Sequence, residues 1–205
     1  PSTFLAVGSR ISLMKKKTSI YLAGPEVFLP NAKEILDQKS SIARETGFIP
    51  IAPGDAKIPK CETKIMHGIA INKYDEKLMI SADAIVANLT PFRGVSADTG
   101  TCFELGFMCA LGRHVCAYTN DKRNYIERVS KYYNDEINYN SLGEIRTKSD
   151  GMLIEDFEMI DNLMLHGSIE TRSGLLETCQ AIESEMFTDL TAYRRVIERL
   201  AKSLL

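Results

Sequence analysis

Residues 82–106, ADAIVANLTPFRGVSADTGTCFELG, combine an apolar run, a loop and the start of a helix within one short stretch. The run at residues 84–89 is bounded by turn residues, which is typical of a strand that is buried on both faces. A loop with proline and glycine follows, and an apolar helix is predicted over residues 101–111. In doubly wound α/β folds, ligands bind where strand ends meet helix starts. Asp98 and Glu104 fall at this place and are therefore candidate functional residues.

Strand-like and helix-like segments alternate along most of the chain. The predicted strands are residues 19–23, 48–52, 84–89, 114–118 and, as the weakest signal, 168–171. The predicted helices between them are residues 31–46, 69–81 and 101–111. Alternating β and α elements predict a parallel sheet with helices on both faces. We therefore expect an α/β fold with a doubly wound, five-stranded parallel sheet.

The second half of the chain departs from this alternation. Residues 120–152 are polar and rich in tyrosine, which predicts a helix at 125–133 followed by a mobile loop. A helical pattern is predicted at residues 152–165, and two amphipathic helices are predicted from residue 173 to the end. We accordingly divide the chain into a flexible N-terminal extension (1–17), a catalytic domain (18–171) and a C-terminal helical extension (172–205).

Composition excludes several classes of protein. The chain has 205 residues, 44% of them hydrophobic, so it can bury one hydrophobic core and its length gives no reason to divide it into two globular domains. A net charge of −2 argues against nucleic acid as the main partner. Five cysteines without a CxxC pair favour a reducing compartment, and we expect a cytoplasmic protein. No apolar run has the length of a membrane span, and the three histidines lack metal-ligand spacing, so neither a membrane nor a metal is expected.

The two carboxylates near residue 100 have both a structural and a functional interpretation. Thr101 and Glu104 have the spacing of a capping box, and Asp98 fits a turn or an N-cap. Either way, a carboxylate in the first turn of a helix faces the positive end of the helix dipole, which is predicted to lower its pKa. An ionised carboxylate held in place is also what nucleophilic attack on an anomeric carbon requires.

Asp75 is harder to explain as a surface residue. On the predicted helix, its neighbours one turn away include Ile71, Leu78 and Met79, so its side chain is expected to point inward. A charge on such a face is costly unless it is paired or lines a polar site. We therefore favour a functional role, in which burial raises the pKa of Asp75 and suits it to proton donation.

The first predicted strand ends in Tyr21-Leu22-Ala23-Gly24-Pro25, which alone indicates a core tyrosine and a tight turn. This turn is neither a dinucleotide-binding fingerprint nor a phosphate-binding loop, so no cofactor is expected. Phe28 and Phe92 are either core residues or stacking platforms for an aromatic base. Arg93 is either a solvated loop charge or a ligand for a phosphate.

Taken together, these motifs resemble the nucleoside 2-deoxyribosyltransferase family. The matching segments are IYLAGPEVF (20–28), the inward Asp75, DAIVANLTPFRG (83–94), DTGTCFELG (98–106) and NLM (162–164). Their order and spacing extend the resemblance over roughly residues 20–169. Residues 172–205 extend beyond the typical family core, and residues 1–13 have no counterpart in it.

The resemblance implies a flavodoxin-like fold and base exchange on 2′-deoxyribonucleosides by double displacement. Glu104 matches the nucleophile, Tyr21 the hydroxyl that holds it, and Asp75 and Asp98 the acids that bind the base and manage its proton. Asn162 matches a residue that reaches the sugar from a neighbouring subunit, so a homo-oligomer, dimer or hexamer, is implied. The substrate-binding residues expected on this basis are Gly24, Phe28, Phe92, Arg93, Gly100, Asn162 and Met164.

Two other functions remain open at this point. One is hydrolysis of 2′-deoxynucleoside 5′-monophosphates with water as acceptor, which Arg93 would suit and Asn162-Leu163-Met164 disfavours. The other is a nucleotide-binding regulator without turnover, which the set of acidic residues around Glu104 disfavours. In the favoured reading, the partners are deoxyribonucleosides, free nucleobases and further copies of the chain.

Overall fold

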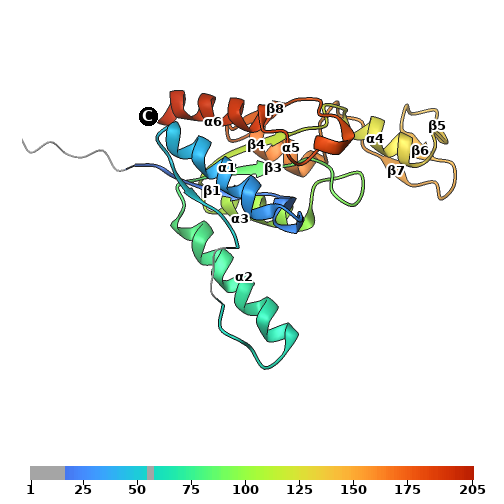
Figure 1. Ribbon diagram of the computed structural model, residues 1–205. Coiled ribbons are helices and arrows are strands. Elements are labelled where there is room, and N and C mark those ends of the chain that lie inside the picture. The colour runs from blue at the N-terminus through green and yellow to red at the C-terminus, as the bar shows by residue number, and fades with distance from the viewer. Residues whose placement is uncertain (1–16, 55–57) are drawn as a thin grey trace, which may run out of the picture.

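A five-stranded parallel sheet forms the centre of the molecule (Figure 1). The computed structural model describes residues 17–54 and 58–205. Across the sheet the strands are β2 (Ile49–Ile51), β1 (Ser19–Ala23), β3 (Ala84–Asn88), β4 (His114–Thr119) and β8 (Leu175–Thr178). This order, with the crossover at β1 and β3, is the flavodoxin-like arrangement of a doubly wound sheet. The predicted fold class is confirmed.

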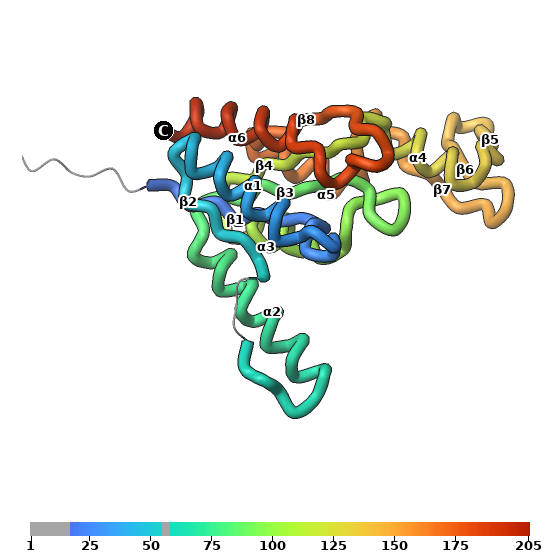
Figure 2. Tube along the Cα trace, in the orientation of Figure 1, coloured from blue at the N-terminus to red at the C-terminus, as the bar shows by residue number. Residues whose placement is uncertain are grey.

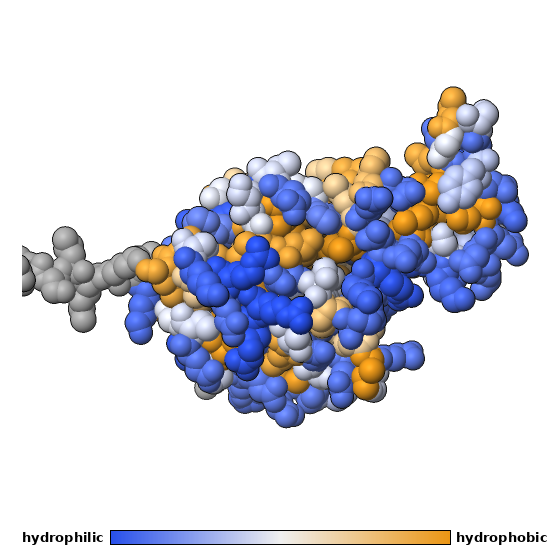
Figure 3. All heavy atoms as spheres, turned by 90° about the horizontal axis from the view of Figure 1, so that it is seen from above, coloured by the Kyte–Doolittle hydropathy of each residue, from blue (hydrophilic) through white to orange (hydrophobic). Residues whose placement is uncertain are grey.

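Helices cover both faces of the sheet. One face carries α1 (Ala32–Glu45) and α6 (Thr191–Leu204), and the other carries α2 (Lys64–Ser81), α3 (Thr99–Ala110) and α5 (Leu163–Glu170). Seen from above, hydrophilic residues and hydrophobic patches are mixed on the surface (Figure 3). The helices predicted at residues 31–46, 69–81 and 101–111 are therefore confirmed, although α2 begins earlier, where Thr63 caps it.

Side chains of each central strand alternate between two hydrophobic cores, as the pleat of a strand requires. In β1, Ile20 and Leu22 pack into the core beneath α1 and α6. Tyr21 and Ala23 pack into the opposite core, beneath α2, α3 and α5. This alternation directs the Tyr21 side chain to the face on which α3 lies.

The fifth strand was predicted in the wrong place. Residues 168–171 belong to the end of α5 and the turn after it, and the strand is β8, at Leu175–Thr178. β8 is an edge strand with half-buried side chains, so it lacks the continuous apolar run of an inner strand. Leu175 and Leu176 lie three to four residues before Cys179, and Ile182 lies three residues after it, as on one face of a helix. This spacing explains why a helix was predicted here in place of a strand.

Two further predictions in the C-terminal half are also wrong. Residues 152–165 form a short strand, β7 (Leu153–Ile154), a loop and the first residues of α5, not one helix. From residue 173 onward there is β8, a short 3₁₀ helix (Glu183–Glu185) and a single α-helix, α6. Because β8 joins the central sheet, the boundary predicted between residues 171 and 172 divides that sheet.

Residues 125–154 form a small lobe with its own core. The predicted helix is α4 (Tyr125–Tyr132), but the predicted loop contains a three-stranded antiparallel sheet, β5 (Ile137–Tyr139), β6 (Ile145–Thr147) and β7. Val129, Ile145 and Ile154 are buried between them. The lobe lies at one end of the central sheet (Figure 2). Apolar side chains show on its surface (Figure 3).

The N-terminal extension predicted for residues 1–17 lies outside the described residues, except for Lys17. All five cysteines are free thiols. Among the described residues, no helix combines the length and the apolarity needed to cross a membrane.

The turn before β8 has no room for a side chain, which provides a test of the corrected strand. A Cβ atom at Gly174 would lie 2.1 Å from the backbone oxygen of Val115. We expect Gly174→Ala to lower the free energy of unfolding by about 1–3 kcal/mol, as overpacking typically does. In Gly167→Ala, the added methyl meets nothing within 4 Å, so stability should hold or rise. Equal unfolding curves for the two variants in urea would contradict this placement of β8.

Candidate active site

The candidate site lies at the carboxyl edge of the sheet, near the crossover between β1 and β3. The chain leaves β1 at Gly24, and it leaves β3 into a loop that ends at Asp98, the N-cap of α3. Crevices at such an edge are where ligands bind in open α/β sheets. The loop after β3 thus joins a buried strand directly to the helix that carries Glu104.

A short hydrogen bond joins β1 to α3 at the centre of the site. The hydroxyl of Tyr21 donates to Oε1 of Glu104 at 2.6 Å, and the Tyr21 side chain is fully buried. Hydrogen bonds between a hydroxyl and an ionised carboxylate are short and strong, so this contact fixes the position of the carboxylate. Tyr21 was expected to hold Glu104, and the structure places the two groups in contact.

Asp98 caps α3, so the capping box considered for Thr101 and Glu104 does not form. Oδ2 of Asp98 accepts hydrogen bonds from the backbone nitrogen of Thr101 at 3.0 Å and from its hydroxyl at 3.2 Å. Glu104 lies beyond the first turn of α3 and bonds to Tyr21 instead. Capping is thus done by Asp98, which leaves the Glu104 carboxylate for another purpose.

The pKa of Glu104 is raised to about 7, contrary to the expectation that the helix dipole would lower it. Burial has the largest effect, because it disfavours the charged form. The hydrogen bond from Tyr21 acts in the opposite direction, and the negative charges of nearby carboxylates raise the pKa further. Those carboxylates belong to Asp75, Asp98 and Glu26. Burial among other acids therefore outweighs the dipole.

Asp75 approaches the same group from α2. Its side chain is half-buried, and burial raises its pKa, as the apolar neighbours on the helix predicted. Its charge influences both Tyr21 and Glu104. Asp75, from the middle of α2, and Asp98, at the N-cap of α3, therefore both act on the Glu104 carboxylate in the second turn of α3. Such a set of interacting acids is typical of sites for proton transfer and nucleophilic attack.

An aromatic stack joins the segments that follow β1 and β3 at the same edge of the sheet. Phe28 and Phe92 are stacked with ring centroids 5.3 Å apart, and the guanidinium of Arg93 lies 4.6 Å from the centre of the Phe92 ring. Arg93 has a φ of 54°, a left-handed conformation that is uncommon for residues other than glycine. Phe28 is 54% exposed, so it is a surface platform and not a core residue.

The two glycines expected to contact substrate are close to acidic side chains. A Cβ atom at Gly24 would lie 1.9 Å from Oε2 of Glu26, and one at Gly100 would lie 3.0 Å from Oδ2 of Asp98. The chain can pass so close to Glu26 only because residue 24 has no side chain.

Asn162 and Met164 lie at the start of α5. Asn162 caps α5: its Oδ1 accepts from the backbone nitrogen of Met164, and its Nδ2 donates to Glu155 at 2.9 Å. Met164 is largely exposed. Among the described residues, no hydrogen bond of the Asn162 side chain leads to Glu104.

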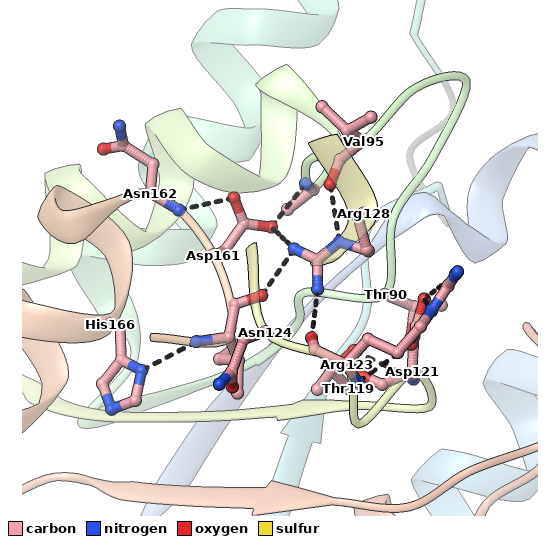
Figure 4. Close-up of polar contacts among 12 residues, drawn as sticks. Thr90, Val95, Thr119, Asp121, Arg123, Asn124, Arg128, Asp161, Asn162 and His166 are labelled. Atoms are coloured by element: carbon pink, nitrogen blue, oxygen red, sulfur yellow. Dashed lines mark hydrogen bonds and ion pairs between the residues drawn. The ribbon is translucent and has the colours of Figure 1, made fainter. Parts of the chain in front are cut away.

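Sequence reasoning missed a buried arginine that ties the site together (Figure 4). Arg128, on α4, donates to the backbone oxygens of Val95 and Ile160 and forms an ion pair with Asp161. Asp161 also accepts from the backbone nitrogen of Ala97. The cluster thereby holds the loop that leads to Asp98 against the start of α5. Arg128 sits in an ordinary amphipathic helix, so its sequence context gave no signal of this role.

The chain is similar to known proteins over most of its length. The family model for nucleoside 2-deoxyribosyltransferase matches residues 20–164. An uncharacterised protein of Schizosaccharomyces pombe is 31% identical over 204 residues, covering 92% of this chain and 91% of the relative. A solved 2-desoxiribosyltransferase from Leishmania mexicana is 26% identical with a TM-score of 0.59, covering 88% of this chain and 97% of that chain. A conserved protein from Enterococcus faecalis V583, 18% identical over 90% of this chain and 99% of that chain, has the same fold with a TM-score of 0.51.

The hydrogen bond between Tyr21 and Glu104 can be tested by titration. Because the bond stabilises the charged carboxylate, we expect Tyr21→Phe to raise the pKa of Glu104 above its value of about 7. Carbon-13 NMR of the glutamate carboxyl carbons, with Glu104→Gln for assignment, measures this directly. Tyr193→Phe is a matched control, since the Tyr193 hydroxyl donates to the backbone oxygen of Lys39. An unchanged titration in Tyr21→Phe would contradict the assigned contact.

Proposed function

Because the chain belongs to the nucleoside 2-deoxyribosyltransferase family, we propose that it exchanges the base of 2′-deoxyribonucleosides through a covalent deoxyribosyl-enzyme intermediate. The observation that carries this proposal is the Tyr21–Glu104 hydrogen bond of 2.6 Å within a group of acids. A carboxylate held by one donor keeps a free oxygen for attack on the anomeric carbon.

In the first half-reaction, the ionised Glu104 attacks C1′ of the bound nucleoside. A bond forms between the carboxylate oxygen and C1′, the bond from C1′ to the base nitrogen breaks, and its electron pair stays on the base. The departing base then takes up a proton, which Asp75 is suited to donate because burial raises its pKa. We assign to Asp98, the N-cap of α3, the task of holding the base.

In the second half-reaction, a different free base attacks C1′ from the side that the first base left. It loses its proton to the acid that had donated one, and the ester bond to Glu104 breaks. Two inversions give net retention of configuration, as in retaining glycosidases. The sugar lacks a 2′-hydroxyl, so positive charge develops on it readily, and the surrounding carboxylates stabilise that charge.

The aromatic stack offers a place for the base. A planar base has the same geometry as the Phe28 and Phe92 rings and can stack on the exposed Phe28. Arg93 now lies against both rings, 5.1 Å and 4.6 Å from their centres. We expect Gly24, Gly100 and Arg93 to line the substrate beside this platform.

Self-association belongs to the same proposal, with Asn162 and Met164 serving the site of a neighbouring copy. Helix α2 projects from the body of the molecule (Figures 1 and 2), and its one buried side chain is Met79, near its C-terminus. Ile65 is 76% exposed and Ile69 is 49% exposed on the projecting part. Exposed apolar side chains that lie close together are typical of a protein interface. We propose that a second copy of the chain covers Ile65 and Ile69.

Hydrolysis of deoxynucleoside 5′-monophosphates is the alternative that one observation favours. Arg93, the cation needed for a phosphate, lines a pocket of about 420 Å³ together with Tyr125 and Glu155. The pocket lies between the loop after β3 and the small lobe, so a phosphate next to the base platform would have a cationic neighbour. Transfer remains the preferred function because the matched family is one of transferases.

Incubation with thymidine and adenine separates these functions. Formation of deoxyadenosine is the expected result, whereas free deoxyribose alone would indicate hydrolysis; a binding protein would leave both compounds unchanged. Repeating the assay with thymidine 5′-monophosphate tests the phosphate alternative.

The nucleophile can be tested in the same assay. We expect Glu104→Ala to lose roughly 10³-fold or more in turnover while still binding nucleoside. Glu198→Ala, an exposed glutamate on α6, should keep wild-type activity. A slow 2-fluoroarabinosyl nucleoside should leave an adduct on Glu104, located by mass spectrometry of peptides. An adduct on another residue, or full turnover in Glu104→Ala, would exclude this mechanism.

The α2 surface gives a separate prediction about assembly. The double variant Ile65→Asp, Ile69→Asp should sediment as a single chain, because four negative charges per dimer would lie in the proposed interface. Ile182→Asp changes an equally apolar residue, 63% exposed, outside α2 and should keep the wild-type mass. If wild type itself sediments as a single chain, the proposed assembly does not form.

A further inference from the structure

A buried ion pair lies behind the candidate site, and the proposed reaction does not use it. Glu26 is 1% exposed and Lys39 is 0% exposed, and Lys39 Nζ lies 2.6 Å from Oε1 of Glu26. Glu26 belongs to a 3₁₀ turn (Pro25–Phe28) directly after β1, and Lys39 to the middle of α1. Burying two charges costs more than their attraction usually returns, so the pair calls for an explanation beyond stability.

The same carboxylate oxygen joins two further strands. Oε1 of Glu26 also accepts hydrogen bonds from Tyr118 on β4 at 2.8 Å and from Asn88, the last residue of β3, at 3.1 Å. Lys39 lies over the rings of Tyr118 and Tyr193, 5.4 Å and 5.1 Å from their centres. One oxygen atom therefore connects the ends of β1, β3 and β4 with α1, and aromatic rings cover the pair.

This network lies on the opposite side of the sheet from the nucleophile. Tyr118 and Tyr193 belong to the core beneath α1 and α6, whereas Tyr21 belongs to the core beneath α2 and α3. The second oxygen of Glu26, Oε2, is buried without a hydrogen-bond partner among the described residues. It occupies the space where a side chain at residue 24 would lie, 1.9 Å from that Cβ position.

We propose that Glu26 is a positioning residue for the transfer reaction. Anchored by Lys39, Asn88 and Tyr118, it holds the turn of residues 24–28, which carries Gly24 and the Phe28 platform, against the ends of the central strands. It also places a fixed negative charge behind Glu104. The inference rests on the proposed function, because the turn matters for catalysis only if substrate binds at this edge.

Charged and titratable groups from several elements face these two glutamates. Around Glu104 they are Tyr21 from β1, Asp75 from α2, Asp98 from the N-cap of α3 and Glu26. Around Glu26 they are Lys39 from α1, Tyr118 from β4, Tyr193 from α6 and Glu104 from α3. The charge of Glu26 raises the pKa of Glu104, so removing that charge should lower it.

Two variants separate the charge of Glu26 from its hydrogen bonds. Glu26→Gln keeps an oxygen that accepts from Lys39 but removes the negative charge. Tyr118→Phe removes one hydrogen bond to the same oxygen and leaves the charge in place. In the NMR titration, we expect the midpoint of Glu104 to move to lower pH in Glu26→Gln and to stay at its wild-type value in Tyr118→Phe.

Kinetics give the second measurement. The turn should loosen when the ion pair is lost, so we expect Glu26→Gln to lose at least tenfold in kcat, with the acid limb of its pH profile moved to lower pH. If Glu26→Gln does not fold, the pair Glu26→Gln, Lys39→Met removes both buried charges together, and kcat should still fall at least tenfold because the turn has lost its anchor. Replacing a buried ion pair by residues of similar volume is often tolerated.

The proposal is overturned if the titration midpoint of Glu104 stays at its wild-type value in folded Glu26→Gln. It is also overturned if Tyr118→Phe shifts that midpoint as much as Glu26→Gln does. The titration requires no turnover, so it gives an answer even if the protein proves not to be a transferase. Wild-type kcat in Glu26→Gln, in a protein that does exchange bases, would refute the positioning role while leaving the proposed function intact.

Discussion

The hydrogen bond from Tyr21 to Glu104 is the contact on which the site depends, because it joins the first strand to the helix after the third. The two residues are 83 positions apart, and only the parallel pairing of β1 with β3 brings them together. β1 must present Tyr21 to the face covered by α3, and the alternation of its side chains does so. A register shift of one residue would turn Tyr21 away and leave the carboxylate buried without a donor.

The site is a compromise between burial and charge. A nucleophilic carboxylate has to be ionised, yet burial and three neighbouring acids raise the pKa of Glu104 to about 7. The same raised pKa makes the carboxylate more basic than a surface glutamate. A smaller fraction of Glu104 is therefore ionised at neutral pH, but the ionised form is more nucleophilic. The hydrogen bond from Tyr21 lowers the pKa and so keeps more of the carboxylate ionised.

The inner part of the fold could be predicted from the sequence because β1, β3 and β4 are buried on both faces and have continuous apolar runs. The position of β8 could not be predicted, because this edge strand has half-buried side chains and includes Glu177 and Thr178, which interrupt the apolar run. In the site, the inward direction of Asp75 and the capping role of Asp98 followed from local spacing. The contact between Tyr21 and Glu104 came only from the family resemblance. The raised pKa of Glu104 and the burial of Arg128 depend on tertiary packing, which local patterns do not report.

The place of β8 in the chain has a consequence for synthesis on the ribosome. Tyr21, Asp75, Asp98 and Glu104 are all translated before the strand and the helix that complete the sheet, β8 and α6. Until those emerge, β4 has an open edge, and the apolar face over which α6 packs is uncovered. The nascent polypeptide thus holds all four acidic and phenolic groups while an open strand edge exposes it to aggregation, and only the addition of β8 and α6 makes them part of a rigid site.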